Sequence, residues 1–591
     1  MGVQDIRVVG VVGCGTMGSG ISELFARAGF DVVVHEVDDA RLEHGMDRIR
    51  HSLDRAVSRG KLSQQDAEAA LGRITGHTTF EALKGSDLVV EAVPERLEAK
   101  RQVFGILDGL LADHAILATN TSSLPVIEMA VATSRPERVV GLHFFNPAPV
   151  MDLVELVRTV TTSPDVLQSV TELAQRLGKT PVVCRDRAGF IANLLLFPYL
   201  NEAVRMLESG FASREDIDAA MRLGAGHPMG PLALMDLVGL DSCYGIMESL
   251  HRQFAERRYA PAPMIKHLVT AGYLGRKSGR GFYTYAEPDS SKVVPDERSG
   301  GRVDLPSGSH PVRSVGVVGT GTMGAGIVQV AARAGMDVVC RGRSEESVAA
   351  AREAMDASMR KAVERGRMQQ AEYDAAAGRV TWTTDLSRLA EVDLVIETVA
   401  EDLDLKRALF AELDRVAHPD AVLASCTSSL PIVELAAATS RPDKVCGVHF
   451  FNPAPVMGLV ELVRTVATST DTLSIAKSAA EGMGKHTVVC EDRAGFIVNR
   501  LLFPYLNDSV RMVEQGYATE KDVDTAMTLG CAHPVGPLAL VDMVGLDVTL
   551  EIMNSLNSEF REPGYAPAPL LEHMGKAGYL GRKTGRGFFT Y

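Results

Sequence analysis

The sequence lacks the features of a membrane-embedded, secreted or metal-binding protein. No run of its 591 residues approaches 18 consecutive apolar residues, which excludes an ordinary transmembrane helix. The segment Met1–Asp5 has neither the basic start nor the apolar stretch of a signal peptide. The eight cysteines form no CxxC pair and no zinc-type spacing. We therefore expect a cytoplasmic protein with reduced thiols and no metal site.

Positive charge is also scarce. The chain has 61 Lys and Arg against 75 Asp and Glu, which gives a net charge of −14. An acidic surface disfavours a phosphate backbone, so nucleic acid is not an expected partner. Apolar residues make up 46% and charged residues 23%, a globular balance. The length suggests about four domains.

The chain contains the same sequence twice. Three landmarks recur: RVVGVVGCGTMGSGIS at 7–22 as RSVGVVGTGTMGAGIV at 313–328, HFFNPAPVM at 143–151 and 449–457, and GRKSGRGFYTY at 275–285 as GRKTGRGFFTY at 581–591. All three pairs are 306 positions apart, so the two copies align without a net insertion. This is a duplication of whole domains and not a solenoid, whose repeats are far shorter.

Within each copy, the residue pattern changes near residue 185. In the first copy five strands are predicted, at Ile6–Val12, Asp31–Val37, Asp87–Val93, Ala115–Thr119 and Val139–Phe144. They alternate with helix-like segments, which predicts a parallel sheet covered on both faces. From Gly189 to the tail the segments look helical. The expected fold is therefore α/β plus all-α, duplicated, with a doubly wound sheet followed by a helical domain in each copy.

These patterns give five expected segments. They are an α/β domain at 1–185, a helical domain at 186–285, a linker at 286–311, a second α/β domain at 312–491 and a second helical domain at 492–591. The linker is rich in Pro, Ser, Gly and charge, which is typical of an exposed connection. A structured hairpin is the alternative.

A glycine fingerprint opens the first copy. Gly13, Gly15 and Gly18 follow a predicted strand and begin a predicted helix, the context that a dinucleotide-binding GxGxxG turn requires. The first glycine permits the tight turn, the second lets a pyrophosphate approach the backbone, and the third allows close helix–strand packing. Glu36 ends the next strand. A carboxylate there accepts ribose hydroxyls and repels a 2′-phosphate, so we expect NAD in this copy.

The second copy departs from this pattern after its fingerprint. It keeps the three glycines as Gly319, Gly321 and Gly324. Gly342 stands in place of the acidic residue, flanked by Arg341 and Arg343. Two guanidiniums there can clamp a phosphate, so we expect NAD or NADP in this copy. The alternative is that the arginines are solvated and the copy merely binds NAD weakly.

Each copy also places a histidine at the end of the last predicted strand and a glutamate 12 residues later. The pairs are His143 with Glu155, and His449 with Glu461. Oxidising an alcohol requires a base, and imidazole, with a reference pKa of about 6.5, suits proton transfer near neutral pH. A carboxylate bonded to its second nitrogen fixes the tautomer and stabilises the cation. The repetition is compatible with catalysis but does not prove it.

Together these motifs resemble the L-3-hydroxyacyl-CoA dehydrogenases, most closely the bacterial 3-hydroxybutyryl-CoA dehydrogenase type. The likeness rests on the fingerprint and on Asn120–Leu124, HFFNP at 143–147, Leu153–Val157, Gly189–Asn193 and Gly226–Pro231, in the family's order. The resemblance implies a Rossmann domain followed by a helical domain, with substrate in the cleft between them. It implies interconversion of a short (3S)-3-hydroxyacyl-CoA and its 3-oxoacyl-CoA. It also implies dimerisation, which a tandem chain can satisfy internally as a pseudo-dimer, with or without further association of whole chains.

Carried over position by position, the resemblance implies three sets of site residues. The catalytic set is Ser122, His143, Glu155 and Asn193, with Ser428, His449, Glu461 and Asn499 in the second copy. Further cofactor contacts are Glu95, Lys100, Asn146 and Lys277, with Glu401, Lys406, Asn452 and Lys583. Coenzyme A contacts are Ser52, Arg59 and Lys61, with Ser358, Arg365 and Arg367, for which a solvated charged helix is the alternative.

The copies depart from the family in different places. Leu194 stands where the family commonly has arginine, whereas the second copy has Arg500, and Cys426 replaces the asparagine that is Asn120 in the first copy. Both copies keep Ser, His, Glu and Asn, so we predict two active sites. The alternative from another class is a cofactor-binding structural or sensory protein with one or both copies catalytically silent. A hydroxyacid dehydrogenase that uses a lysine base is not favoured, because Phe190–Asn193 offers only asparagine.

Overall fold

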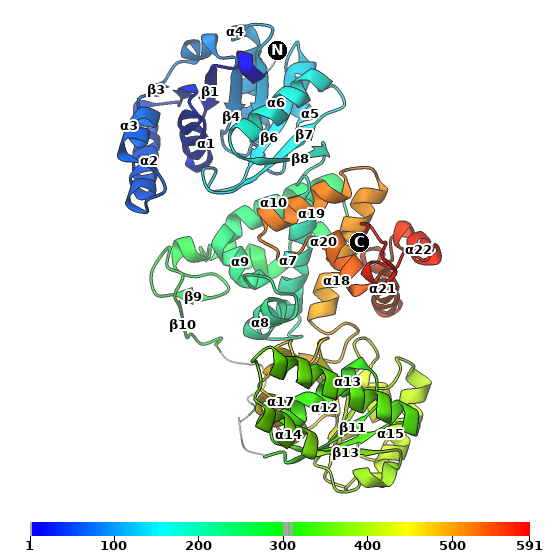
Figure 1. The fold of residues 1–591 in the computed structure, drawn as a ribbon. Helices are drawn as coiled ribbons and strands as arrows, with labels where there is room; N and C mark the ends of the chain where they lie inside the picture. Colours follow the sequence, from blue (N-terminus) through cyan, green and yellow to red (C-terminus); the bar gives the residue numbers. More distant parts are fainter. Residues whose placement is uncertain (1–2, 300–304, 306–310) are drawn as a thin grey trace.

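The computed structural model describes residues 3–299, 305 and 311–591. Two α/β domains lie at opposite ends of the molecule, and the two helical domains lie between them (Figure 1). Each α/β domain contains one eight-stranded sheet, with the orders β3-β2-β1-β4-β5-β6-β7-β8 and β13-β12-β11-β14-β15-β16-β17-β18. Only β6 with β7 and β16 with β17 pair antiparallel within these sheets; all other neighbours are parallel. The predicted doubly wound fold is confirmed in both copies.

The strands occupy matching positions in the two copies. In the first sheet they are β1 (Val8–Val12), β2 (Asp31–His35), β3 (Ile74–His77), β4 (Leu88–Glu91), β5 (Ile116–Thr119), β6 (Val139–Phe144), β7 (Leu153–Arg158) and β8 (Thr180–Arg185). In the second they are β11 (Ser314–Val318), β12 (Asp337–Arg341), β13 (Val380–Thr383), β14 (Leu394–Glu397), β15 (Val422–Ser425), β16 (Val445–Phe450), β17 (Leu459–Arg464) and β18 (His486–Glu491).

The helices also repeat in order. The first half has α1 (Thr16–Arg27), α2 (Asp39–Ser58), α3 (Gln64–Leu71), α4 (Leu97–Leu110), α5 (Ile127–Ala130), α6 (Pro164–Arg176), α7 (Ala192–Glu208), α8 (Arg214–Gly224), α9 (Pro231–Val238), α10 (Leu240–Phe254) and α11 (Pro263–Thr270). The second has α12 (Thr322–Arg333), α13 (Glu345–Glu364), α14 (Gln370–Gly378), α15 (Leu403–Val416), α16 (Ile432–Ala436), α17 (Thr470–Gly482), α18 (Val498–Glu514), α19 (Glu520–Gly530), α20 (Pro537–Val544), α21 (Leu546–Phe560) and α22 (Pro569–Lys576). Among the described residues, no helix is both long and apolar enough to cross a bilayer.

Both faces of each sheet are buried, as the near-continuous apolar strands predict. In β4, Leu88 and Val90 pack into one apolar core with α1 and α6, whereas Val89 packs into another core on the opposite face with α4. The second sheet repeats this alternation. The core that contains Val89 continues through both helical domains to the inner face of the second sheet. The halves therefore share one apolar core.

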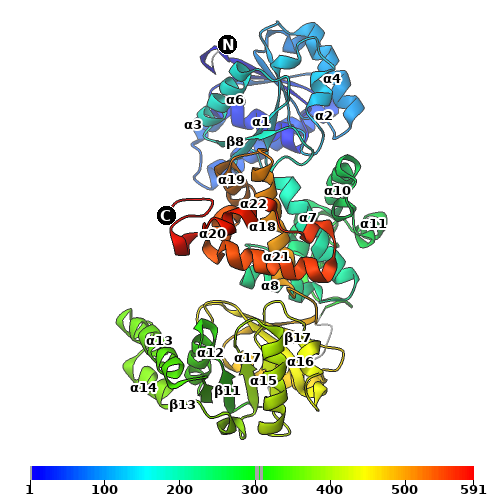
Figure 2. The same ribbon diagram turned by 90° about the vertical axis from the view of Figure 1, so that its right-hand side faces the viewer.

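The helical domains contact each other and the opposite sheets through related pairs of residues. The N–H of Arg185 donates to the carbonyl of Tyr517 at 3.3 Å, and the N–H of Glu491 donates to the carbonyl of Phe211 at 3.2 Å. Each residue of one pair is 306 positions from its counterpart in the other. The contacts thus repeat with the halves exchanged. In Figure 2, α19 of the second half lies beneath β8 of the first sheet, which it contacts.

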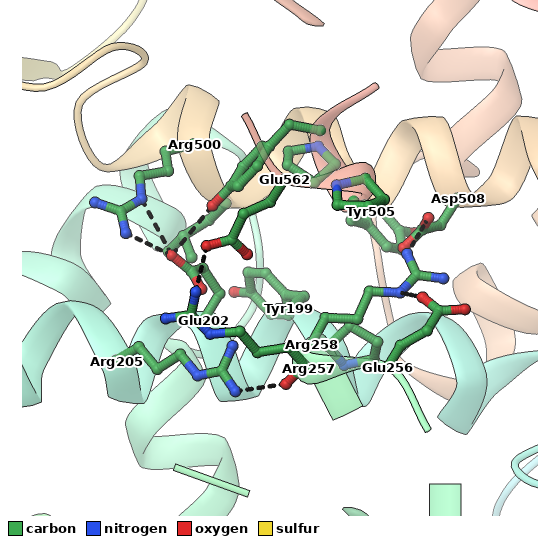
Figure 3. Close-up of a pocket in the computed structure, with 16 residues that line it drawn as sticks. Tyr199, Glu202, Arg205, Glu256, Arg257, Arg258, Arg500, Tyr505, Asp508 and Glu562 are labelled. Carbon is green, nitrogen blue, oxygen red and sulfur yellow. Dashed lines mark hydrogen bonds and ion pairs between the residues drawn. The ribbon is translucent and has the colours of Figure 1, made fainter. Parts of the chain in front are cut away.

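Between α7 and α18 the two halves enclose a cavity of about 320 Å³ (Figure 3). Ion pairs from opposite halves cross it, with Arg500 bound to Glu202 and Arg258 bound to Asp508. The counterpart of Arg500 in the first half is Leu194, and the counterpart of Arg258 in the second half is Gly564. Each half therefore supplies one arginine that the other half lacks.

The first part of the predicted linker is structured. A short strand β10 (Val293–Val294) pairs antiparallel with β9 (Thr284–Tyr285), so this part matches the hairpin alternative. The carboxylate of Asp296 binds the buried guanidinium of Arg214 at the start of α8, with Nη2 2.7 Å from Oδ1. Most of the predicted linker after Ser299 lies outside the described residues.

Candidate active sites at the domain junctions

The predicted histidine–glutamate pair lies on two adjacent antiparallel strands. His143 on β6 and Glu155 on β7 are direct partners in the register, which explains the spacing of 12 residues. Nδ1 of His143 lies 2.7 Å from Oε2 of Glu155. Glu155 is fully buried and His143 is 6% exposed. A carboxylate only accepts hydrogen bonds, so Nδ1 donates and Nε2 of the neutral ring remains available as a base.

The second oxygen of this carboxylate is held by the helical domain. Oε1 of Glu155 accepts hydrogen bonds from the N–H groups of Ile191 (3.0 Å) and Ala192 (2.9 Å). These groups begin α7, where backbone N–H groups have no partner within the helix and negative charge is favoured. Glu155 therefore orients the histidine and joins the two domains at the same point.

Asn193 of the helical domain contacts Ser122 of the α/β domain. The side-chain amide of Asn193 donates to the carbonyl of Ser122 at 3.3 Å. Ser122 lies in the loop that follows β5, and Asn120 at the start of this loop accepts a hydrogen bond from the N–H of Phe144 at 2.9 Å. The structure therefore brings together all four residues predicted as the catalytic set of the first copy.

The second copy repeats this geometry. Nδ1 of His449 lies 2.7 Å from Oε2 of Glu461, whose Oε1 accepts hydrogen bonds from the N–H groups of Ile497 (3.1 Å) and Val498 (2.9 Å). Ser428, His449 and Asn499 line a cavity of about 940 Å³ between the α/β and helical domains. Cys426 also lines it, and burial raises the pKa of its thiol to about 12, so this position presents a neutral thiol where the first copy has an amide.

The glycine fingerprints fit a dinucleotide. A Cβ added to Gly13, which has φ +95°, would lie 2.8 Å from the carbonyl oxygen of Ala92, and one added to Gly18 would lie 1.8 Å from that of Gly13. Nothing lies within 4 Å of a Cβ added to Gly15. The first and third glycines are therefore required by the fold, whereas the second leaves open space at the N-terminus of α1, where a pyrophosphate binds in such turns.

In the second copy Gly319, Gly321 and Gly324 repeat this pattern. A Cβ added to Gly319, which has φ +124°, or to Gly324 would meet neighbouring atoms at 2.4 and 2.1 Å, whereas nothing lies within 4 Å of one added to Gly321. The open space above the helix N-terminus is therefore present in both copies. These turns would hold the diphosphate of the cofactor.

The two copies differ at the position where the sequence predicts contact with the cofactor's ribose, which is Glu36 in the first copy and Gly342 in the second. Oε2 of Glu36 accepts a hydrogen bond from the N–H of Cys14 at 2.8 Å, which places the carboxylate beside the glycine turn. In the second copy Gly342 is buried, and an added Cβ would lie 2.7 Å from Oγ of Ser347. The Arg341 side chain donates from Nε to the carbonyl of Thr384 at 3.3 Å, whereas Arg343 is exposed.

Glu95 and Lys100 support the loop that carries Ser122. One oxygen of Glu95 accepts hydrogen bonds from the N–H groups of Ser122 and Ser123, both at 3.1 Å. Burial alone would raise the pKa of Glu95, but the charge of Lys100 and the hydrogen bond from Thr121 outweigh burial and lower it. Lys100 is buried between Glu91 and Glu95. Glu401 and Lys406 are arranged in the same way and line the second cavity.

The remaining predicted residues lie around these centres. Asn146 and Asn452 are exposed directly after β6 and β16, and Asn452 lines the second cavity. Lys277 and Lys583 bind Asp241 and Asp547 at the starts of α10 and α21. The residues predicted to contact coenzyme A lie on or just after α2 and α13, which project from the sheets: Ser52, Arg59, Lys61, Ser358, Arg365 and Arg367. The structure does not place these six among the residues that line the second cavity.

One contribution to the site was not predicted. Residues 223–227, from the helical domain of the first half, line the cavity of the second half. A contact between segments more than 200 residues apart has no local sequence signal. The available hints are glycine at both Gly224 and Gly530, the matching ends of α8 and α19, and the family-like motif Gly226–Pro231, which begins in this segment.

Comparison with known proteins agrees with this geometry. The family model described as 3-hydroxyacyl-CoA dehydrogenase, NAD binding domain, matches residues 8–187 and 314–493. The model described as 3-hydroxyacyl-CoA dehydrogenase, C-terminal domain, matches residues 189–285 and 495–591. Both domain types therefore occur twice, in the order that the fold shows.

Individual relatives match either one half or the whole chain. The 3-hydroxybutyryl-CoA dehydrogenase of Mycobacterium tuberculosis (strain H37Rv) is 51% identical over 282 residues, which cover 47% of this chain and 99% of that protein. The 3-hydroxyadipyl-CoA dehydrogenase of Escherichia coli (strain K12) is 31% identical over 568 residues, which cover 96% of this chain and 97% of that protein. A crystal structure of 3-hydroxybutyryl-CoA dehydrogenase from Escherichia coli K12 superposes with a TM-score of 0.71 and 29% identity, covering 97% of this chain and all of that one. The chain therefore belongs to the 3-hydroxyacyl-CoA dehydrogenase family and is an oxidoreductase that carries the family's NAD-binding and C-terminal domains in duplicate.

Proposed function

We propose that each half interconverts a short-chain (3S)-3-hydroxyacyl-CoA and the corresponding 3-oxoacyl-CoA. The observation that carries the proposal is the buried His–Glu pair, present twice, beside a serine from the α/β domain and an asparagine from the helical domain. The similarity to a 3-hydroxybutyryl-CoA dehydrogenase and a 3-hydroxyadipyl-CoA dehydrogenase supports a short acyl thioester as substrate.

The arrangement supports a role for each side chain. Nε2 of His143 takes the proton from the C3 hydroxyl, and Glu155 stabilises the imidazolium that forms. Ser122 and Asn193 donate hydrogen bonds to the oxygen, which carries partial negative charge while the carbonyl forms or is reduced. The turn at Gly13, Gly15 and Gly18 would hold the cofactor, which would supply the hydride acceptor for C3. His449, Glu461, Ser428 and Asn499 have the same roles in the second half.

Activity of the two sites can be separated in the intact chain. We expect each single variant, His143→Gln or His449→Gln, to retain oxidation of NADH by acetoacetyl-CoA at its unchanged site. The double variant should lose about 100-fold or more of the total rate. Apparent Tm values checked by calorimetry would show that the variants stay folded. Loss of all activity from one substitution alone would show that the other half is silent.

For the second half we propose that NADP is accepted as well as NAD, whereas the first half uses NAD. Ser344 caps α13, so the helix N-terminus and the exposed Arg343 lie directly after the buried Gly342. Helix N-termini and guanidiniums are both suited to a phosphate. The absence of a carboxylate at position 342 removes the repulsion that Glu36 exerts in the first half. The alternative remains weak binding of NAD alone.

The chain offers a built-in reporter for this half. Trp382, the only tryptophan, lies on β13 opposite Cys340 of the neighbouring strand β12. Titration of its fluorescence with NADH and NADPH should show NADPH binding at least as tight as NADH, and Arg343→Ala should weaken NADPH by about tenfold or more. Lys576→Ala, an exposed charge on α22, is the matched control. NADH binding tighter than NADPH, with no effect of Arg343→Ala, would discard NADP.

We further propose that the two halves act as an internal pseudo-dimer. We also propose that four cations, Arg59, Lys61, Arg365 and Arg367, attract the phosphates of coenzyme A. The exchanged backbone contacts of Arg185 with Tyr517 and of Glu491 with Phe211 support the first proposal. Exposure of the four cations after α2 and α13 supports the second. Charge-neutral substitutions of these cations should raise the KM for acetoacetyl-CoA more strongly at low ionic strength than at high.

A further inference from the structure

The second active site is closed by a loop from the first half. Besides Ser428, His449 and Asn499, its cavity is lined by residues 223–227. This segment is the end of α8 and the turn that follows, and α8 packs on β17 and β18. The wall of the second cavity therefore contains atoms of the first half.

The first site has the same arrangement with the halves exchanged. α19 packs on β7 and β8, and its last residue is Gly530. A Cβ added to Gly530 would lie 2.8 Å from Cδ2 of Leu153 and 3.3 Å from Cε1 of Phe145. The ring of Phe145 lies 4.7 Å from that of His143. Only glycine allows the helix end to approach the catalytic strands this closely.

The two loops meet each other between the sites. The imidazole rings of His227 and His533 are stacked, with centroids 4.1 Å apart and planes 15° apart. Nδ1 of His227 lies 3.2 Å from the hydroxyl of Tyr199, and Nδ1 of His533 lies 3.0 Å from that of Tyr505. Both imidazoles are buried. The stack therefore fixes the position of both loops relative to both sites.

The loops differ at the residue that ends each helix. Ala225 caps α8 and lines the second cavity, whereas Cys531 is the matching cap of α19. Burial, followed by the negative charge of Glu155, raises the pKa of the Cys531 thiol to about 12. The thiol is thus neutral and near the glutamate of the first site. The loops also differ at Gly226 against Ala532, a position that is exposed and at which Gly226 lines the second cavity.

The residue directly before the site asparagine also differs between the halves, and at this position the larger residue belongs to the second half. Ala192 begins α7 in the first half, and Val498 begins α18 in the second, where it lines the cavity and approaches Gly224. The first site thus has a small residue of its own and a larger one from the other half, and the second site has the reverse.

We propose that the acyl-chain preference of each active site is set by the loop of the opposite half, through Cys531 at the first site and Ala225 at the second. The proposal rests on the proposed function, because the acyl chain belongs to that substrate. A thiol occupies slightly more than one methyl group, and a pocket wall that gains or loses about one methylene changes discrimination by about tenfold.

The test uses full-length chains in which one site is silenced. His449→Gln leaves the first site to be measured, and His143→Gln leaves the second. In the first background, Cys531→Ala should raise kcat/KM for 3-oxohexanoyl-CoA relative to acetoacetyl-CoA by about tenfold, and Cys531→Val should lower it. In the second background, Ala225→Val should lower the same ratio, while Cys531→Ala leaves it within about twofold.

The outcomes separate the two proposals. If a silenced background fails to reduce acetoacetyl-CoA, the proposed function of the remaining site fails, and this is seen before either loop is changed. If both backgrounds are active, the assignment of Cys531 to the first site is overturned by either of two results. One is that Cys531→Ala and Cys531→Val leave the ratio of the two kcat/KM values unchanged at the first site. The other is that they change this ratio at the second site instead. Dissociation constants of the two thioesters for the same variants give a second measurement where turnover is too low.

Discussion

Arg500 of the second half binds Glu202 of the first half with Nη2 2.6 Å and Nε 3.1 Å from the same carboxylate oxygen. The guanidinium also lies 4.6 Å from the ring of Phe560. Both charged side chains are largely buried, with 13% and 20% exposed. The arginine beside the site asparagine therefore forms its ion pair across the contact between the halves.

Arg500→Leu, which copies the first half, should destabilise the chain. Removing one partner leaves Glu202 buried with only the hydroxyl of Tyr565 at 3.3 Å, and the expected loss is about 3 kcal/mol. The double variant Arg500→Leu, Glu202→Leu should recover much of it, because no unpaired charge is left. Denaturant unfolding measures both. Lys576→Gln, which breaks an exposed pair with Glu572, is the control and should cost at most about 0.5 kcal/mol. A double variant as unstable as the single one would contradict this reading.

Two glycines of the second fingerprint should respond differently to alanine. Gly321→Ala adds a methyl group into open space at φ −74°, so the apparent Tm should stay unchanged while NADH binding weakens by about tenfold or more. Gly324→Ala places its Cβ 2.1 Å from the carbonyl oxygen of Gly319 and should lower the Tm. Calorimetry and Trp382 fluorescence report the two effects. Equal losses of stability in both variants would argue against the open space at Gly321.

Acid should weaken the contact between the halves at the histidine stack. Burial lowers the pKa of His227 to about 4 and that of His533 to about 3. The unfolded histidines take up protons near pH 6.5 and the folded ones only below these values, so stability is full above pH 6.5 and falls as the pH drops toward 4. For His227 the loss is on the order of 3 kcal/mol. His227→Asn should flatten the fall in Tm between pH 7 and pH 4, and an unchanged slope would rule out this source.

The segment after β10 should be fastened by one ion pair. Hydrogen bonds from Arg214 hold the pKa of Asp296 well below its usual range, so this stabilisation is present above pH 4 and is lost as the pH falls below it. Asp296→Asn should lower the Tm and speed hydrogen exchange of residues 286–299. Glu297→Gln, at a side chain that is 68% exposed, should do neither. Unchanged exchange in Asp296→Asn would show that the hairpin holds the segment without this pair.

Local signals predicted much of the fold. β6 begins and ends at the predicted residues, Val139–Phe144, where six consecutive residues are buried directly after the charged Arg138. β3, β7 and β8 were not predicted as strands. Of these, β7 was noted only as the motif Leu153–Val157, although five of its six residues are buried. Ile74–His77 buries only its first residue at the sheet edge, and Thr180–Arg185 buries two of its six residues, so neither carries a strong apolar pattern.

The residues of the site could likewise be predicted where the sequence signal is local and not where it depends on tertiary packing. The gap between His143 and Glu155 is a local distance that an antiparallel pair of strands converts into a contact, and both residues could be predicted. The loop at residues 223–227 could not, because its position depends on how two helical domains pack. Arg500 was noticed for its place in a motif, whereas its partner Glu202 lies 298 positions away.

Covalent linkage changes what evolution can do with the contact between Ala225, Cys531 and their opposing strands. In a homodimer every substitution is made on both sides at once, so a bulky residue in one pocket is a bulky residue in its twin. Here the two sides of the contact are encoded by different segments of one gene, so each can be substituted alone. Under the proposed function, the two sites can therefore acquire different substrate preferences through independent substitutions in the opposite half.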